Sequence, residues 1–511
     1  MQPEDRDCGS IQTDILNSRS LYIVSNRGPV TIQADDSGEK RFHRSGGGLV
    51  TALLEMAKAI PSTWIAAAMG EEDRAWKEGD LPIGEGGENI HVQFVPLEPE
   101  VYEGFYQSIS NPLLWFLQHS LWDFANAPTI NRDTWKAWND GYVAANRAFA
   151  DAVVNAVRRD HKPALVMLQD YHLYLAPRFI RSRLRIRRNL LLTHFIHIPW
   201  PGPEDWGLLP RPMREAILDG LCALDLVGFQ TREDALNFIR TCESLLPGAV
   251  VNYRRGRVIF RNHITHVRDF PISIDVESVC AQAETEEVAQ FREQIEGLVG
   301  DRKMILRIER TEPSKNIVRG FQAYDEMLES HPEHRGGVQF VAILVPSRLE
   351  VEEYQGYLDK IMAAAGSVNA RYGTPEWEPV RVLVGESYPR ALAAMQRYDA
   401  LLVNPVADGM NLVAKEGPVV NQRNGVVILS ERAGAHQQLG EHALVIAPVD
   451  VSETAEALHQ ALVMPDHERA RRAHALREAV EREDIHLWLC WQMDAIRLML
   501  RRAEEKRHEK V

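Results

Sequence analysis

The feature that most constrains the fold is a regular alternation of short apolar runs with segments of helical periodicity. The runs in the first half of the chain occupy residues 21–25, 164–168, 190–198 and 226–229. Those in the second half occupy residues 304–308, 340–345, 380–384, 401–403, 426–429 and 443–446. This alternation predicts an α/β fold with doubly wound parallel sheets, in which ligands bind where the strands end.

The alternation divides into two units. A break at residues 269–271 precedes a polar helical stretch over 276–295, and we place the domain boundary at this break. We expect a flexible N-terminus over residues 1–20, one domain over 21–271, a second over 272–483 and a C-terminal helix over 484–511.

The composition limits the classes of function. The chain has 511 residues, and 58 Lys and Arg against 72 Asp and Glu give a net charge of −14, so we expect no nucleic-acid partner. The polar N-terminus and the lack of a long apolar run predict a cytoplasmic protein with no membrane partner. The five cysteines are dispersed, which argues against a disulfide framework and a structural zinc site.

Candidate ligand-binding residues follow the runs of the first half. Arg27 comes directly after the first run, and Gly47 lies within three consecutive glycines that open a predicted helix. Free amides at such a helix start suit an anion, although a flexible loop tip explains the glycines equally well. Asp170 and His197 follow two neighbouring runs, where they could recognise hydroxyl groups. A purely structural role for such a histidine stays open.

The second half offers a basic turn and a glycine turn. Arg310 and Lys315 follow the run over 304–308, where they could neutralise a diphosphate as a fork and a point charge. A solvated basic turn is the alternative. Asp408 and Gly409 precede a predicted helix, whose amides could bind a phosphate, and Glu416 lies two turns further on.

Taken in order, these segments resemble the trehalose-6-phosphate synthase family of retaining glycosyltransferases, over about residues 21–488. The matching motifs are Ser-Asn-Arg, Gly-Gly-Leu, Asp-Tyr-His, His-Ile-Pro-x-Pro, Gly-Phe-Gln-Thr, Glu-Arg-x-x-x-Ser-Lys, Pro-Ser-Arg and Asp-Gly-Met-Asn-Leu-Val-Ala-Lys-Glu. The resemblance implies a GT-B architecture, with two Rossmann-like domains and a cleft between them. The first domain would bind the acceptor, the second would bind the nucleotide sugar, and the C-terminal helix would cross back.

The resemblance also implies a role for individual residues. The donor-binding set is Gly47, Arg310, Lys315, Asp408, Gly409, Met410, Asn411, Leu412, Val413 and Glu416. The catalytic set is His197, Asp170, Arg310, Lys315 and Asp408. The acceptor phosphate would be held by Arg27, Tyr106, Trp115 and Arg348. We expect a nucleotide sugar and a sugar phosphate as partners, no metal and no cofactor, and the family allows a homo-oligomer.

Several positions near these motifs depart from the family pattern. Ala68 replaces a tryptophan, and the segment Thr311-Glu312-Pro313 replaces Leu-Asp-Tyr. Asn316 replaces a glycine, and Ala407 replaces an arginine. The leading hypothesis is synthesis of α,α-trehalose 6-phosphate from a nucleoside diphosphate glucose and glucose 6-phosphate. The alternatives are a related transferase with another phosphorylated acceptor, such as a cyclitol or glycerol phosphate, and a weakened homologue that senses metabolites. The donor base is not encoded in these motifs.

Overall fold

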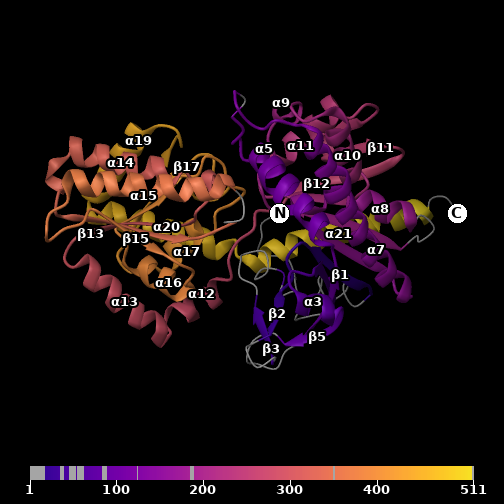
Figure 1. The fold of residues 1–511 in the computed structure, drawn as a ribbon, viewed down its shortest axis with the longest axis horizontal. Coiled ribbons are helices and arrows are strands. Elements are labelled where there is room, and N and C mark those ends of the chain that lie inside the picture. Colours follow the sequence, from indigo (N-terminus) through magenta and orange to yellow (C-terminus); the bar gives the residue numbers. More distant parts are fainter. Residues whose placement is uncertain are drawn as a thin grey trace. The chain divides into compact units, whose positions relative to one another are not determined.

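A computed structural model describes residues 18–34, 39–44, 53, 62–82, 89–123, 125–184, 189–348 and 352–508. The chain forms two compact units (Figure 1). The first contains Met1–Pro271 and His486–Val511, and the second contains Ile272–Ile485. Within the described residues, the helices are too short or too polar to span a bilayer.

The first unit is built on a ten-stranded sheet in the order β10-β11-β12-β9-β8-β7-β1-β4-β6-β5. Its strands are β1 (Ser20–Ser25), β4 (Ser62–Ala67), β5 (Glu78–Pro82), β6 (Asn89–Val95), β7 (Ala164–Gln169), β8 (Leu190–Ile196), β9 (Leu226–Phe229), β10 (Val250–Asn252), β11 (Arg257–Phe260) and β12 (His263–Asp269). The seven neighbouring strands β12-β9-β8-β7-β1-β4-β6 run parallel to one another. At the two edges of the sheet, β5 pairs antiparallel with β6, and β10 and β11 form antiparallel pairs next to β12. The strand order reverses between β1 and β7, which is the position where doubly wound sheets bind ligands.

Helices cover this sheet. The strands β2 (Val30–Ala34) and β3 (Lys40–Arg44) form a separate two-stranded antiparallel sheet. The longer helical segments are the π-helical η2 (Glu103–Trp115) and η3 (Ala137–Val143), α7 (Ala144–Arg159), α8 (Ala176–Arg183), α10 (Arg211–Leu221) and α11 (Arg232–Leu245). The shorter ones are α3 (Glu71–Trp76), α4 (Pro99–Tyr102), α5 (Phe116–Gln118), α6 (Arg132–Lys136), η4 (Tyr171–Leu173), α9 (Pro203–Trp206) and η5 (Tyr253–Arg255). One large buried cluster joins the strands to η2, α7 and α10.

The C-terminal helix α21 (Ile485–His508) packs on the first unit. Trp488 donates a hydrogen bond from its indole nitrogen to the carbonyl of Phe270 at 3.1 Å, and its ring meets Phe195 edge-on at 5.3 Å. Cys490 in this helix is disulfide-bonded, whereas the other described cysteines are free thiols. The expectation from cysteine spacing is therefore wrong for Cys490.

The second unit has a six-stranded parallel sheet in the order β15-β14-β13-β16-β17-β18. Its strands are β13 (Lys303–Arg310), β14 (Val338–Val345), β15 (Val380–Val384), β16 (Ala400–Val403), β17 (Val426–Ser430) and β18 (Leu444–Ile446). Numbered within the unit, this order is 3-2-1-4-5-6, the order of a Rossmann fold. The order reverses between β13 and β16, and the basic turn and the glycine turn follow these two strands.

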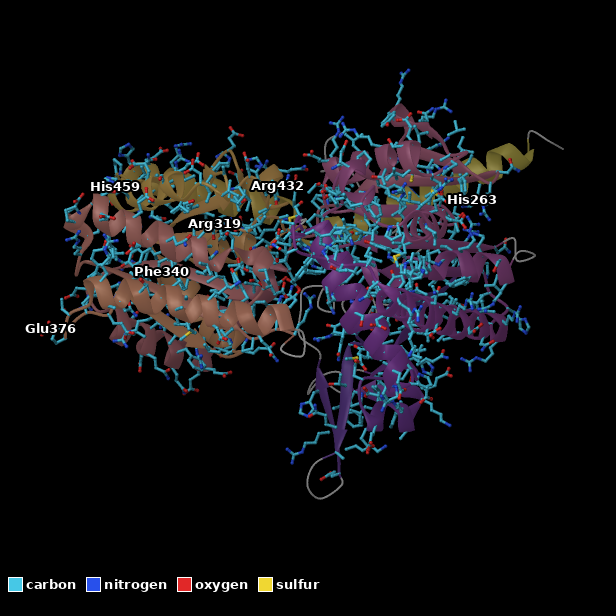
Figure 2. All side chains as sticks on the ribbon, turned by 45° about the horizontal axis from the view of Figure 1, so that its top comes forward. His263, Arg319, Phe340, Glu376, Arg432 and His459 are labelled. Atoms are coloured by element: carbon cyan, nitrogen blue, oxygen red, sulfur yellow. The ribbon has the colours of Figure 1, made fainter. Side chains whose placement is uncertain are left out.

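Two helical layers enclose this sheet (Figure 1). The helices are α12 (Val276–Ala283), α13 (Glu286–Val299), η6 (Pro313–Lys315), α14 (Ile317–Ser330), η7 (Pro332–His334), α15 (Glu352–Tyr372), α16 (Tyr388–Arg397), α17 (Val413–Val420), α18 (His436–Leu439), α19 (Val451–Val463) and α20 (Asp466–Arg482). Helices α14, α15 and α19 pack together on one face, and α12, α13 and α16 on the other. Phe340 of β14 lies in the core, where its ring contacts Phe321 and Tyr324 (Figure 2).

The predicted α/β fold class is confirmed. All ten predicted runs form strands, within a few residues at each end. The parallel strands β4 and β6 were not predicted, because Ser62–Ala67 is alanine-rich and Asn89–Val95 is interrupted by polar residues. The polar stretch over 276–295 divides into α12 and α13 rather than one helix.

Candidate active site

The basic turn after β13 contains a buried lysine between two carboxylates. Lys315 is 8% exposed, and its ammonium nitrogen lies 2.5 Å from Asp408 Oδ2 and 3.7 Å from Glu309 Oε2. The Asn411 amide nitrogen donates to both acids, to Asp408 Oδ2 at 3.1 Å and to Glu309 Oε1 at 3.2 Å. Lys315, Asp408 and Asn411 therefore come together, and Lys315 does not belong to a solvated turn.

The charges of this cluster support each other. Burial opposes the positive charge of Lys315, but Asp408 and Glu309 outweigh it, so the pKa of Lys315 is raised. Burial also raises the pKa of Glu309, although Lys315 and Arg307 act in the opposite direction. Lys315 is therefore a fixed positive charge at neutral pH, and its geometry is set by its acidic neighbours.

A second buried cation holds the backbone of this turn. Arg307, in the middle of β13, is fully buried and donates to the carbonyls of Lys315 at 2.9 Å and Ile317 at 3.3 Å. It also contacts the side-chain oxygen of Asn404. Asn316 has the left-handed conformation, with φ 58° and ψ 37°, and asparagine tolerates this conformation better than most residues. The substitution of the family's glycine by Asn316 thus keeps the turn.

Two arginines expected at different phosphates share one carboxylate. Glu312 is fully buried, and its Oε1 lies 3.3 Å from an Arg310 guanidinium nitrogen and 3.5 Å from one of Arg348. Ser347 also donates its hydroxyl to this oxygen, at 3.0 Å. Burial favours protonation of Glu312, but Arg310 and Arg348 outweigh it and lower its pKa to about 2. Arg348 additionally donates to the Tyr354 hydroxyl at 2.8 Å.

The glycine turn is fixed by a close backbone approach. A Cβ atom on Gly434 would lie 1.8 Å from the carbonyl oxygen of Gly409, so only glycine fits there. The amide of Gly434 donates to the Asp408 carbonyl at 3.0 Å, and the amide of Ala435 donates to the Met410 carbonyl at 2.9 Å. These bonds position Asp408 beside Lys315.

The glycine turn leads into α17. Leu412 is the N-cap and Val413 the first residue of this helix. The Ala414 amide donates to Asn411 Oδ1 at 3.2 Å and the Lys415 amide to the Leu412 carbonyl at 2.9 Å, so an anion here would be bound by the amides of Leu412 and Val413. Glu416 lies in its first turn, and the Tyr388 hydroxyl donates to Glu416 Oε1 at 3.2 Å. Burial raises the pKa of Glu416 to about 7, and the Tyr388 bond limits the rise. Gly47, expected to help at the donor phosphates, lies outside the described residues.

In the first unit, Asp170 and His197 come together at the ends of β7 and β8. Asp170 has a positive φ of 64°, which is uncommon for a non-glycine residue and typical of functional turns. Its Oδ1 accepts the backbone N–H of His197 at 3.3 Å, and His197 Nε2 lies 3.0 Å from the Gln169 side-chain oxygen. Burial, assisted by His194, lowers the pKa of His197 to about 3, so this imidazole is neutral at neutral pH.

The remaining acceptor residues of the first unit differ in exposure. Arg27 is exposed directly after β1. Tyr106, on η2, is half-buried and stacks on His172 with ring centroids 5.8 Å apart. Trp115 is only 5% exposed and stacks on His119 at 3.9 Å. Arg348, the fourth residue of this set, belongs to the second unit.

The chain is similar to known proteins over most of its length. The model of glycosyltransferase family 20 matches residues 19–497. The chain belongs to glycosyltransferase family 20. The resemblance in the sequence motifs is thus confirmed, and the chain is a glycosyltransferase with the GT-B fold class.

Relatives and solved structures cover nearly the whole chain. A bifunctional trehalose-6-phosphate synthase/phosphatase of Thermoproteus tenax is 35% identical over 92% of this chain, which spans 62% of that protein. A UDP-forming α,α-trehalose-phosphate synthase of Schizosaccharomyces pombe is 33% identical over 94% of this chain and 90% of its own length. An E. coli structure with bound UDP-2-fluoro glucose has a TM-score of 0.79 and 27% identity, over 93% of this chain and 98% of the other. A UDP-forming α,α-trehalose-phosphate synthase structure from Burkholderia vietnamiensis has a TM-score of 0.80 and 25% identity, over 95% and 99%.

Sequence reasoning missed the acidic and buried partners in this family 20 site. Glu309 and Arg307 were not singled out, and Glu312 was noted only as a departure. A usable signal was present in β13. Its two end residues, Lys303 and Arg310, are exposed, but Arg307 and Glu309 lie in its buried interior among apolar residues, and charges buried in a strand need partners.

Proposed function

We propose that this glycosyltransferase makes α,α-trehalose 6-phosphate, with retention, from a nucleoside diphosphate glucose and glucose 6-phosphate. The observation that carries the proposal is Lys315, a buried ammonium group kept charged by Asp408 and Glu309 at the point where the Rossmann strand order reverses. The Schizosaccharomyces pombe relative is a UDP-forming α,α-trehalose-phosphate synthase, which supports the choice of product.

In this proposal the donor binds to the second unit. Lys315 and Arg310 neutralise the diphosphate, because one is a buried point charge and the other a half-exposed fork at the same turn. The amides around Leu412 and Val413 bind a phosphate oxygen, and Gly47 assists. Asp408 contacts the transferred glucose, and Glu416 binds the ribose hydroxyls.

The acceptor phosphate interacts with Arg27, Tyr106, Trp115 and Arg348. Asp170 accepts hydrogen bonds from the hydroxyl groups of the acceptor sugar. His197 contacts the transferred sugar as a neutral imidazole, so it forms a hydrogen bond with a hydroxyl group and does not act as a cation.

The reaction breaks the bond between glucose C1 and the diphosphate oxygen, and forms a bond between C1 and the acceptor hydroxyl oxygen. The hydroxyl attacks from the face that the diphosphate leaves, through an oxocarbenium-like transition state. The departing phosphate oxygen takes the hydroxyl proton, so no protein nucleophile takes part. Lys315 and Arg310 stabilise the charge that develops on the leaving group. The proposal includes no metal, because these two cations supply the positive charge.

The decisive experiment is a donor-by-acceptor activity matrix. UDP-, GDP- and ADP-glucose are each combined with glucose 6-phosphate, a cyclitol phosphate and glycerol phosphate, and the product is identified by NMR. We expect glucose 6-phosphate to be the best acceptor and the product to have the α,α configuration. Turnover with the cyclitol phosphate but not with glucose 6-phosphate would overturn the proposed acceptor. Sugar-phosphate binding without nucleoside diphosphate release would overturn the enzymatic function.

A further inference from the structure

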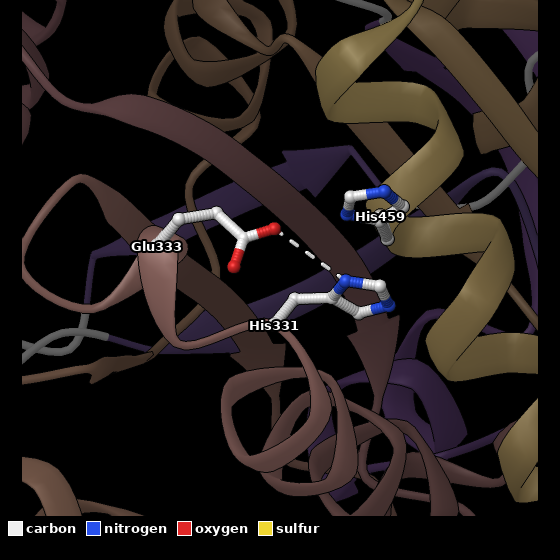
Figure 3. Close-up of side chains that lie close together, drawn as sticks. All are labelled: His331, Glu333 and His459. Atoms are coloured by element: carbon white, nitrogen blue, oxygen red, sulfur yellow. Dashed lines mark ion pairs between the residues drawn. The ribbon is translucent and has the colours of Figure 1, made fainter.

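A group of histidines and glutamates lies in the second unit, apart from the candidate active site. His331 follows α14, Glu333 belongs to η7, and His459 lies on α19 (Figure 3). One ligand atom from each of these residues lies within 4.8 Å of the others. The proposed glycosyl transfer uses none of these three side chains.

The distance between His331 and Glu333 is that of two metal ligands. His331 Nδ1 lies 3.5 Å from Glu333 Oε1, which is too long for a good hydrogen bond. Two ligand atoms of a tetrahedral zinc ion with bonds of about 2.0–2.1 Å lie roughly 3.3–3.5 Å apart. The first two ligands are therefore already at a suitable spacing.

Each histidine also has a partner for its second ring nitrogen. His331 Nε2 lies 3.4 Å from Glu456 Oε2, and His459 Nδ1 lies 2.9 Å from His334 Nε2. Metal-binding histidines usually give their other nitrogen to such a partner, which fixes the ring and its tautomer. This arrangement leaves His331 Nδ1 and His459 Nε2 for an ion.

We propose that His331 Nδ1, a carboxylate oxygen of Glu333 and His459 Nε2 bind one divalent transition-metal ion, for which zinc is the best fit. Two imidazoles and one carboxylate match the preferences of zinc, whereas calcium and magnesium prefer oxygen ligands alone. Glu333 is 60% exposed, so water can complete the coordination.

Binding requires one side-chain movement. The His331 and His459 rings are stacked, with centroids 3.7 Å apart and planes inclined by 10°. Parallel rings cannot both direct a lone pair at one ion, so the His459 ring turns about its side-chain bonds and gives up its present contact with His334. The outer partner that keeps its position is then Glu456, beside His331. His331 is about one quarter exposed and His459 is not fully buried, so the movement does not disturb the core.

The position of the ion indicates a structural role. Helix α14 starts two residues after Lys315, and its 14 residues span about 20 Å before His331. The ion would join the connection between α14 and β14 to α19. It would therefore stabilise the second unit without taking part in the transfer reaction.

The test is a zinc titration of the full chain after treatment with EDTA. Binding is measured by competition with a chromophoric chelator, and the melting temperature is recorded with and without zinc. We expect the wild type to bind one more zinc equivalent than His331→Ala or His459→Ala. Zinc should raise the melting temperature of the wild type but not that of these two variants. Glu456→Gln, which changes an outer partner, should bind this equivalent about 10–100-fold more weakly.

Two variants complete the design. His474→Ala removes an exposed histidine of α20 and should bind zinc like the wild type. Glu333→Gln changes a mostly exposed side chain, so it should fold normally and still lose the equivalent. Equal zinc stoichiometry and affinity in the wild type, His459→Ala and Glu333→Gln would overturn the site. Transfer activity in EDTA, measured on the same samples, tests the proposed function separately.

Discussion

Replacement of Lys315 by methionine tests the buried cluster that carries the proposed function. Lys315 is 8% exposed and pairs with Asp408 at 2.5 Å and Glu309 at 3.7 Å. Lys315→Met therefore removes the cation between the buried Glu309 and the partly buried Asp408, and Arg307 is then the remaining cation that acts on Glu309. Removal of one partner of a buried ion pair typically costs about 3–5 kcal/mol of unfolding free energy. The sequence alone suggests the opposite, because a lysine in a ligand-binding turn is expected to contribute little to stability.

A companion variant separates stability from catalysis. Glu309→Gln removes one of the two carboxylates that lose Lys315 as a partner. The unfolding free energy of the double variant Lys315→Met/Glu309→Gln should therefore be at least about 1 kcal/mol higher than the sum of the two single changes predicts. The rate should not recover, because both variants lack the buried ammonium group that acts with Arg310 on the leaving diphosphate. We expect both variants to turn over at least about 10²–10³-fold more slowly than the wild type.

Local stability is measured by hydrogen exchange of peptides from β13 and α17, which reports on the second unit alone. Activity is followed as nucleoside diphosphate release. Lys360→Met, an exposed lysine on α15, is the matched control and should change stability by less than about 0.5 kcal/mol. A loss of less than about 1 kcal/mol in Lys315→Met would refute the buried-pair reasoning. Recovery of the rate in the double variant would refute the role of Lys315 at the diphosphate.

Three further changes probe other contacts of the second unit. Burial lowers the pKa of Lys415 from 10.5 to about 7. Between these two pH values the unfolded chain binds more protons than the folded chain. The unfolding free energy of the wild type should therefore rise with pH in this range, by up to about 1.4 kcal/mol per pH unit. Lys415→Met should lose this slope in urea unfolding at pH 7–10. Glu312→Gln should raise KM for both substrates by roughly tenfold, because two arginines lose their shared counter-ion. Steady-state kinetics with unchanged KM values would contradict that coupling. Gly434→Ala should cost about 1–3 kcal/mol, because its Cβ would lie 1.8 Å from the Gly409 oxygen. A melting temperature equal to that of the wild type would argue against this close approach.

Sequence patterns predicted the strands that are mainly apolar, because burial on both faces leaves a nearly continuous signal, interrupted by Arg307 in β13 and Arg381 in β15. They did not predict β4 and β6, and they gave no indication of the π-helical turns of η2, which keep Pro112 inside a helical segment. Residue order also could not show that Gly434 lies against Gly409, since this contact joins separate loops. The family resemblance did bring Lys315 and Asp408 into one candidate set. They lie together because the turns after β13 and β16 meet where the strand order reverses.

The acidic partners explain how an acidic chain can keep cations for phosphates. A buried, unpaired ammonium group would lose its proton, and an unpaired guanidinium group, which stays protonated, would destabilise the fold, so each needs a counter-ion when no ligand is bound. Glu309 and Asp408 provide this for Lys315, and Glu312 provides it for Arg310 and Arg348. A phosphate that binds these cations must compete with carboxylates, which weakens binding of weakly charged ligands most. The same carboxylates keep the cations in place before the diphosphate leaves, and such preorganisation lowers the barrier to the transfer.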